Sequence, residues 1–217
     1  MHGVGKRSLC DQLSPTSAVL SNMLQSLDIY VTTSNLPGPS TLATTTPASL
    51  YSLFEANSMA PFLALKYAPA AMKKTTPKGS YANAAPKDRA YGSIIVVSSV
   101  ANSAPASGNV GPGFTVAAHA ALGVVRAGVA ALKGSGVRIN CVSAGSIVEP
   151  GTQAVDVGDL PGESAPVGRG GLERLGLPME VARVVGFLSS GFSSYMTGSN
   201  VVVDGGASVM GSLGVVP

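Results

Sequence analysis

Short apolar runs alternate with longer stretches of helical periodicity along this 217-residue chain. The runs predict four strands, over Leu27–Thr32, Ser93–Val97, Val137–Ser143 and Asn200–Val203. Because consecutive positions in each run are apolar, the strands should be buried on both faces, which is typical of a parallel sheet between helices.

The stretches between these runs predict helices over Pro15–Gln25, Ala48–Met72, Gly113–Lys133 and Pro178–Ser189. Ser14 is a plausible N-cap for the first, and the first and last begin with proline, which suits the first helical position. Strands alternating with helices predict an α/β fold, a doubly wound parallel sheet with right-handed crossovers. The length suits one domain over residues 1–217.

Two stretches predict irregular structure. Thr75–Tyr91 is polar, basic and contains prolines, so we expect a surface loop. Glu149–Gly171 is rich in glycine, proline and acidic residues, and we expect a mobile flap over a cleft because long loops are often functional.

Composition narrows the class of protein. With 45% hydrophobic and 12% charged residues, the chain is too apolar to be disordered. The net charge of +3 and pI of about 9.0 permit a nucleic-acid partner, but the basic residues are scattered and lack interleaved aromatics, so we expect none. The densest basic group comprises Lys73, Lys74, Lys78, Lys87 and Arg89, and a solvated loop is the favoured interpretation.

Targeting and membrane signals are weak. Lys6 and Arg7 are not followed by an apolar run, so no signal peptide is expected. Val116–Leu132 is apolar, but His119 and Arg126 interrupt it, and we expect a core helix and no membrane span.

The two cysteines, Cys10 and Cys141, match no metal or redox spacing, so buried thiols in a reducing compartment are expected. We predict a cytoplasmic protein without a bound metal.

Five segments in one order resemble a known family: Gly92–Ser99 with its paired serines, Phe114–Gly123, Arg138–Gly145, Arg174–Ala182 and Thr197–Gly206. They are similar to the Ser-bearing strand, the Tyr-x-x-x-Lys helix, the Pro-Gly turn, a Pro-Glu helix start and the terminal Gly-Gly of the short-chain dehydrogenase/reductase family. Upstream, Cys10-Asp11, Leu27–Val31 and Asn57 also resemble family positions.

The resemblance implies a Rossmann-like oxidoreductase that binds NAD(P), and it assigns roles to individual residues. Ser99 would polarise the substrate oxygen, and Asn57 would bend its helix and hold a water. Asp11 would contact the adenine, with Gly145 and Ile147 against the rest of the cofactor. Phe114, Ala144 and Ser146 would border the substrate.

Departures from the family pattern are as informative. Phe114 stands in the Tyr position and Ala118 in the Lys position, so the usual proton donor and ribose clamp are missing there. Thr32–Asn35 replaces Asn-Asn-Ala-Gly, and the first βαβ unit has no counterpart ahead of Cys10. Gly3–Lys6 is no substitute for the Gly-rich turn, because no strand precedes it. Weak or no NAD(P) binding is therefore expected.

Four residues keep two interpretations open. Ser99 either lines the cleft or caps a strand end, and Asn57 either has the family role or is satisfied by backbone. Glu149 either steadies a cationic ligand or is a solvated loop acid. His119 either replaces the missing acid or base or is a packed helix histidine; it lies about 100° around the helix from Ala118, away from the cleft, so the packed histidine is favoured.

Two classes of function remain. One is a repurposed enzyme acting on an apolar small molecule, through iminium reduction or a cyclisation or isomerisation in the old cleft, with Ser99, Asn57 and Glu149 as catalytic candidates. The other is a non-catalytic remnant or pseudoenzyme. Self-association through the long helices 48–72 and 113–133 is the expected oligomeric contact.

Overall fold

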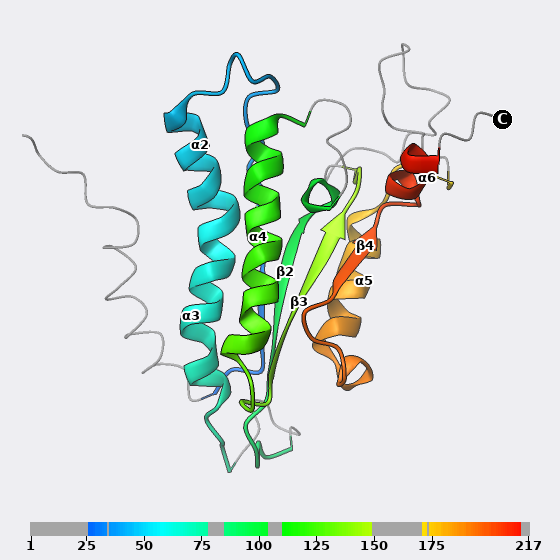
Figure 1. Cartoon of the computed structure of the whole chain (residues 1–217). Coiled ribbons are helices and arrows are strands. Elements are labelled where there is room, and N and C mark those ends of the chain that lie inside the picture. Colours follow the sequence, from blue (N-terminus) through cyan, green and yellow to red (C-terminus); the bar gives the residue numbers. More distant parts are fainter. Residues whose placement is uncertain are drawn as a thin grey trace, which may run out of the picture.

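A four-stranded parallel sheet forms the centre of the molecule (Figure 1). The computed structural model describes residues 26–33, 35–77, 85–103, 110–148, 171–172 and 174–213, without the side chains of 211–213. The strands lie in the order of the chain: β1 Ile29–Thr32, β2 Gly92–Ser99, β3 Val137–Ala144 and β4 Asn200–Val203. All three neighbouring pairs are parallel, so the four predicted strands are confirmed with ends shifted by one or two residues.

One face of the sheet is covered by α3 (Ala60–Met72) and α4 (Pro112–Ala131). Ile94 and Val96 of β2 point to this face and share a buried cluster with Leu122 and Val125 of α4. Side chains alternate along a strand, so Ile95 between them points to the opposite face.

That opposite face is covered by α5 (Pro178–Ser189), which buries Val181 and Leu188 against Ile95 and Val142. Helices on both faces of a parallel sheet confirm the predicted Rossmann-like, doubly wound architecture. The fold also contains a short helix, α6 (Ala207–Leu213), that the sequence pattern did not predict.

The helix predicted over Ala48–Met72 is interrupted. The chain forms α2 (Pro47–Phe54), a π-helical turn at Glu55–Met59 and then α3. Asn57 lies in that turn, buried, and its amide group makes two hydrogen bonds to the backbone of Leu36. A wide turn of this kind is often found where a side chain has a special role.

The apolar helix α4 is a core helix, as predicted. By length and composition it could cross a membrane, but Ala117, Ala121 and Val125 on one side of it are fully buried against α3 and the sheet. Burial against α3 and the sheet therefore explains why α4 is so apolar.

One residue of the predicted basic loop is not solvated. Lys87 is 3% exposed, and its ammonium group forms an ion pair with Asp28 at 2.9 Å and donates to the Leu27 carbonyl. Its backbone forms an isolated bridge with Thr76, which ties the ends of the loop together. The prediction of a wholly solvated loop is therefore wrong at Lys87.

Several predictions concern residues outside the described part of the chain. These are the helix Pro15–Gln25, Cys10, Asp11, Glu149 and the flap as far as residue 170.

Candidate functional site at the carboxyl ends of the strands

Three strands end side by side where the sequence predicted a site. Ser99 pairs with Ala144, and Ala144 pairs with Val203, so the carboxyl ends of β2, β3 and β4 meet at one edge. Ligands of open α/β sheets bind at this edge.

Gly145 brings two of these strands close together. Its N–H donates to the Val203 carbonyl at 2.9 Å, and a Cβ at this position would lie 2.6 Å from the Cβ of Asp204. That distance is too short for any side chain, so the predicted turn depends on glycine here.

The segment after Gly145 pairs with the loop before α5. The Ser146 carbonyl accepts from Gly176 N–H at 3.0 Å, and the Gly176 carbonyl accepts from Val148 N–H at 2.9 Å. These bonds hold Ser146 and Ile147 against a pocket of about 210 Å³ that Val203 and Asp204 also line. Since pockets for drug-sized ligands start at roughly 300 Å³, this one suits a small group.

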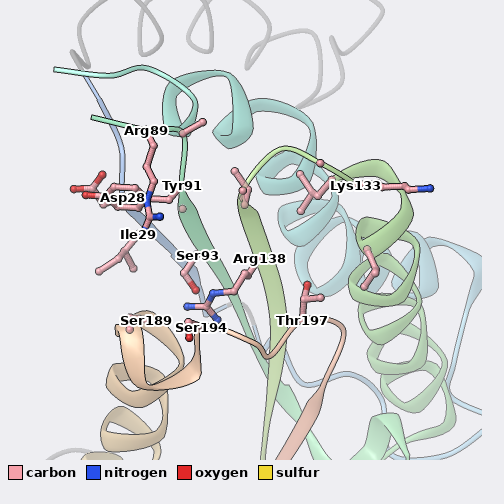
Figure 2. Close-up of a pocket in the computed structure, with 18 of the residues that line it drawn as sticks. Asp28, Ile29, Arg89, Tyr91, Ser93, Lys133, Arg138, Ser189, Ser194 and Thr197 are labelled. Atoms are coloured by element: carbon pink, nitrogen blue, oxygen red, sulfur yellow. The ribbon is translucent and has the colours of Figure 1, made fainter. Parts of the chain in front are cut away.

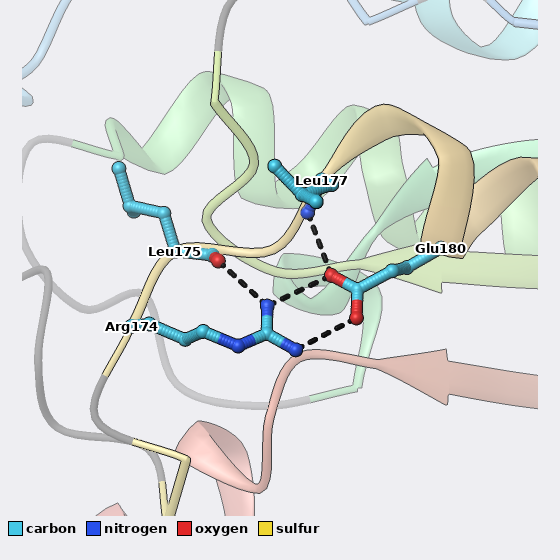
Figure 3. Close-up of polar contacts among 4 residues, drawn as sticks. All are labelled: Arg174, Leu175, Leu177 and Glu180. Atoms are coloured by element: carbon cyan, nitrogen blue, oxygen red, sulfur yellow. Dashed lines mark hydrogen bonds and ion pairs between the residues drawn. The ribbon is translucent and has the colours of Figure 1, made fainter. Parts of the chain in front are cut away.

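An ion pair forms one wall of the pocket (Figure 3). Arg174 donates to both oxygens of Glu180, at 2.8 and 2.9 Å, and Leu177 N–H donates to the same carboxylate at 2.8 Å. The Arg174 and Leu177 bonds lower the pKa of Glu180 to about 2. The carboxylate therefore stays ionised at neutral pH and also caps the start of α5.

Asp204 forms another wall. Its carboxylate accepts from the N–H groups of Gly206 and Ser208, at 2.8 and 2.7 Å. Burial acts to raise the pKa of this carboxyl, but the hydrogen bonds from Ser208 and Gly206 outweigh it, and the pKa lies below its usual value. The carboxylates of Glu180 and Asp204 are thus both bonded to neighbouring residues of the chain.

Ser99 begins a short 3₁₀ turn at the end of β2. Its hydroxyl oxygen accepts a long hydrogen bond from Ala101 N–H, at 3.3 Å, as expected of a cap. Because an acceptor role leaves the hydroxyl proton free, Ser99 retains a donor for a ligand, and its place in the cleft stays a prediction.

Comparisons with known proteins bear on the whole of this framework. A family model described as Enoyl-(Acyl carrier protein) reductase matches residues 10–208. The chain belongs to the short-chain dehydrogenase/reductase family.

Its relatives within the family are enzymes with longer chains. It is 28% identical over 173 residues to the short-chain dehydrogenase fogB of Aspergillus ruber, which covers 77% of this chain and 61% of that protein. It is 40% identical over 118 residues to human (3R)-3-hydroxyacyl-CoA dehydrogenase, covering 53% and 42% of the two chains. This chain therefore spans about three fifths or less of the length of these relatives.

The fold is shared with solved structures. The acetoin dehydrogenase of Enterobacter cloacae superimposes with a TM-score of 0.73 at 21% identity, covering 95% of this chain and 73% of the other.

The family's Tyr-x-x-x-Lys helix corresponds to the start of α4, where the two predicted positions point inward. Phe114 is 6% exposed, and it packs with Ala118 against Ala101 of the 3₁₀ turn. This packing leaves little of the Phe114 ring accessible. Its role in substrate binding stays a prediction.

Thr115 and His119 lie one position after Phe114 and Ala118, respectively, so they have the same four-residue spacing. Unlike Phe114 and Ala118, they are accessible. His119 is exposed, so the expectation that it packs into the core is wrong. Its Nδ1 lies 2.9 Å from the Thr115 carbonyl oxygen. Since a carbonyl cannot donate, Nδ1 carries the proton, and in the neutral ring Nε2 is the basic nitrogen. The sequence showed the spacing of these two residues, but it did not show that they lie on the accessible side of α4.

A buried polar network lies beneath α4, and sequence reasoning missed it. Asn102 donates to the Ser143 hydroxyl at 2.7 Å, the Ser143 hydroxyl donates to Asn200, and the Asn200 amide donates back to Asn102 at 3.3 Å. Burial raises the pKa of the adjacent Cys141 thiol, which stays protonated. Local sequence carries no signal for this cluster because its members lie 40 to 100 residues apart.

The described residues fit one end of a dinucleotide better than the other. Ser99 and Gly145 lie at the carboxyl edge and Ile147 lines the pocket beside it, and their contacts with a nicotinamide and a substrate stay predictions. Asp11, the predicted adenine contact, and Glu149 lie outside the described ranges.

Among the described residues, β4 runs through Gly205 and Gly206 into α6, which is the arrangement that usually cradles a pyrophosphate. Here the N–H groups of Gly206 and Ser208 already donate to the Asp204 carboxylate, so this turn does not offer them to a phosphate.

Proposed function

We propose that this chain binds a small apolar molecule at the carboxyl edge and acts on it as a divergent family member. The proposed reaction is hydride transfer to an iminium ion, or else a cyclisation or isomerisation in the same cleft. The partner is a small molecule, with neither nucleic acid nor membrane involved, and the proposed setting is the cytoplasm.

One observation carries the proposal. Phe114 and Ala118 face the core, so neither a phenol nor an ammonium group reaches the carboxyl edge from these positions. Reduction of a ketone needs both a hydride and a proton. An iminium ion needs the hydride alone: it adds to carbon, the C=N electron pair moves to nitrogen, and a neutral amine and oxidised cofactor result.

The experiment has two steps. First, NADPH and NADP⁺ are titrated into the 217-residue chain by calorimetry. Second, the absorbance of NADPH is followed with N-methyl-3,4-dihydroisoquinolinium, a preformed iminium, and with 2-tetralone, a ketone of similar size. The reductase predicts micromolar cofactor binding and turnover of the iminium without the ketone. Turnover of the ketone would overturn the proposal, because it needs a proton donor in the cleft, and Phe114 and Ala118 supply none.

A non-catalytic binding protein is the second candidate. The glycine turn between β4 and α6 has its N–H groups bonded to Asp204, and this favours the second candidate, since such a turn supplies much of the affinity for a pyrophosphate when its N–H groups are available. No heat of binding with either cofactor would exclude the reductase and leave a non-redox pocket or a remnant. Saturable binding of 2-tetralone, seen by ligand-observed NMR and lost on Gly145→Ala, would then mark the pocket.

A further inference from the structure

The turn that follows β2 joins the Ser99 hydroxyl to the buried network beneath α4. It is the 3₁₀ turn Val100–Asn102, and it is closed by the Ser103 N–H, which donates to the Val100 carbonyl at 3.1 Å. The Ala101 N–H donates to the Ser99 hydroxyl oxygen at 3.3 Å. Short 3₁₀ turns have poor hydrogen-bond geometry, so the position of this turn depends on contacts with the rest of the fold.

The last residue of the turn supplies such a contact. Asn102 is 1% exposed, and its side-chain amide donates to the Ser143 hydroxyl of β3 at 2.7 Å and to the Cys141 sulfur at 3.6 Å. Its carbonyl oxygen accepts from the Asn200 amide of β4 at 3.3 Å. The same Asn200 amide donates to the Ser103 hydroxyl, directly after the turn, at 3.4 Å. Asn102 therefore fastens the turn to two strands of the sheet.

The bonds of this network have one consistent direction. The Ser143 hydroxyl donates its single proton to the Asn200 carbonyl oxygen, so it can only accept from Asn102. Asn102, Ser143 and Asn200 thus form a closed ring in which each side chain donates once and accepts once. Bonds in such a ring strengthen one another, and removing one donor leaves a buried acceptor unpaired. The ring therefore favours a single position for the turn.

We propose that Asn102 is a positioning residue for Ser99, and that it keeps the Ser99 hydroxyl proton available to a ligand at the carboxyl edge. The inference rests on the proposed function, because it requires a ligand at this edge. The Ala101 N–H occupies a lone pair of the Ser99 oxygen and so leaves the proton as the free group. Without the Asn102 anchor the turn moves, this bond is lost, and the hydroxyl rotates among its staggered positions.

Ligand affinity tests the proposal. The ketone oxygen of 2-tetralone can accept from Ser99, whereas tetralin has the same two rings without an oxygen. Ligand-observed NMR gives both dissociation constants. Asn102→Ala should weaken 2-tetralone by roughly two- to tenfold, the range of one hydrogen bond, and leave tetralin unchanged. In a Ser99→Ala background, Asn102→Ala should have no further effect, because its action passes through Ser99.

The matched control is another buried polar residue, Ser193, at the opposite end of the sheet. It is also 1% exposed, and its hydroxyl donates to the Leu188 carbonyl at 3.0 Å. Ser193→Ala should lower stability and leave the affinity for both ligands unchanged. Equal weakening of 2-tetralone by Ser193→Ala and Asn102→Ala would overturn the proposal, because a general loss of stability would explain it. The same conclusion follows if Asn102→Ala acts as strongly in the Ser99→Ala background as in wild type.

A second measurement needs no ligand. Ala101 packs against Phe114, so its methyl group should show a nuclear Overhauser effect to the Phe114 ring. This effect should be lost in Asn102→Ala and kept in Ser193→Ala. If circular dichroism shows that Asn102→Ala does not fold, Ser143→Ala replaces it, because it opens the same ring from β3.

The two measurements separate this inference from the proposed function. If wild type binds neither 2-tetralone nor tetralin, the proposed function fails, and the Ala101 methyl alone then decides whether Asn102 holds the turn. If wild type binds both equally, an apolar ligand still occupies the edge, but Ser99 donates no bond and the inference is wrong. An unchanged Overhauser effect in Asn102→Ala would also overturn it.

Discussion

The two ends of the same strands are held together in different ways. At the amino end, the Arg138 side chain lies beside Ser93 and Ser194 (Figure 2). Its guanidinium donates to the carbonyls of Leu188, Ser190 and Met196, at 2.9 to 3.3 Å. The Ser93 hydroxyl donates to the same Leu188 carbonyl at 2.9 Å. The Leu188 and Ser190 carbonyls lie at the end of α5, where they have no partner within the helix, and the Met196 carbonyl lies in the loop before β4.

At the carboxyl end, backbone contacts dominate. Gly145 lies against Asp204, and Ser146 pairs with Gly176, while the Ser99 hydroxyl keeps a free proton. The amino end therefore uses side chains for stability, and the carboxyl end leaves side chains available for a ligand. Substitutions at the two ends should separate these two properties.

The largest expected effect is at the amino end. Arg138→Met keeps much of the aliphatic stem but removes three hydrogen bonds made by a charged group, and we expect unfolding to cost about 2–4 kcal/mol less. Urea denaturation measures this free energy. Arg126→Met, at an exposed arginine of α4, is the control and should change this free energy by less than about 0.5 kcal/mol. Equal effects of the two substitutions would show that the carbonyls do not depend on Arg138.

At the carboxyl end, Gly145→Ala should affect both stability and the pocket. The new Cβ meets the backbone and Cβ of Asp204, so the strands must separate, at a cost of about 1–3 kcal/mol. We expect loss of any ligand bound at the 210 Å³ pocket, measured by calorimetry. Unchanged stability and binding would mean that Asp204 moves freely, contrary to its two hydrogen bonds.

A glycine away from both ends of the strands should give a change in the free energy of unfolding of the opposite sign. A Cβ on Gly123 of α4 would meet no atom within 4 Å. Gly123→Ala should therefore raise the free energy of unfolding by up to about 1 kcal/mol, because alanine loses less backbone entropy in a helix. Thermal unfolding gives the comparison, and destabilisation here would indicate that this face of α4 is covered in solution.

The smallest expected effect depends on pH. The pKa of Glu180 is lowered from 4.5 to about 2, so its ionised form stabilises the fold above pH 4.5. That contribution is lost as the pH falls from about 4.5 toward 2, when the folded protein finally takes up the proton. Glu180→Gln should remove this part of the acid-unfolding profile, and Arg174→Gln should weaken it. A profile identical to wild type would show that the exposed pair contributes nothing.

The sheet was predictable because its signal is local. The runs at β2 and β3 are apolar at consecutive positions, and burial on both faces follows directly from that pattern. Their parallel pairing followed from burial on both faces and from the alternation of strands with helices.

The rest depends on contacts between distant residues. Asn57 lies in the π-turn and bonds to Leu36, which is 21 residues earlier in the chain. A pattern of neighbouring residues could not show this contact. Lys87 is buried because Asp28 lies beside it in the fold, 59 positions away in the chain. Which face of α4 is covered is decided by α3 and the sheet, so periodicity could not show that Phe114 turns inward and His119 outward.

The Asn57 clamp has a consequence for solvent exchange. Leu36 has an exposed side chain, yet its amide proton is held by the buried Asn57 carbonyl oxygen at 2.7 Å. Deuterium should enter this amide slowly and its neighbours in the same loop quickly, since exchange requires the clamp to open. The exchange rate of the Leu36 amide would therefore measure how often the hydrogen bond opens between the π-turn and the segment that follows β1.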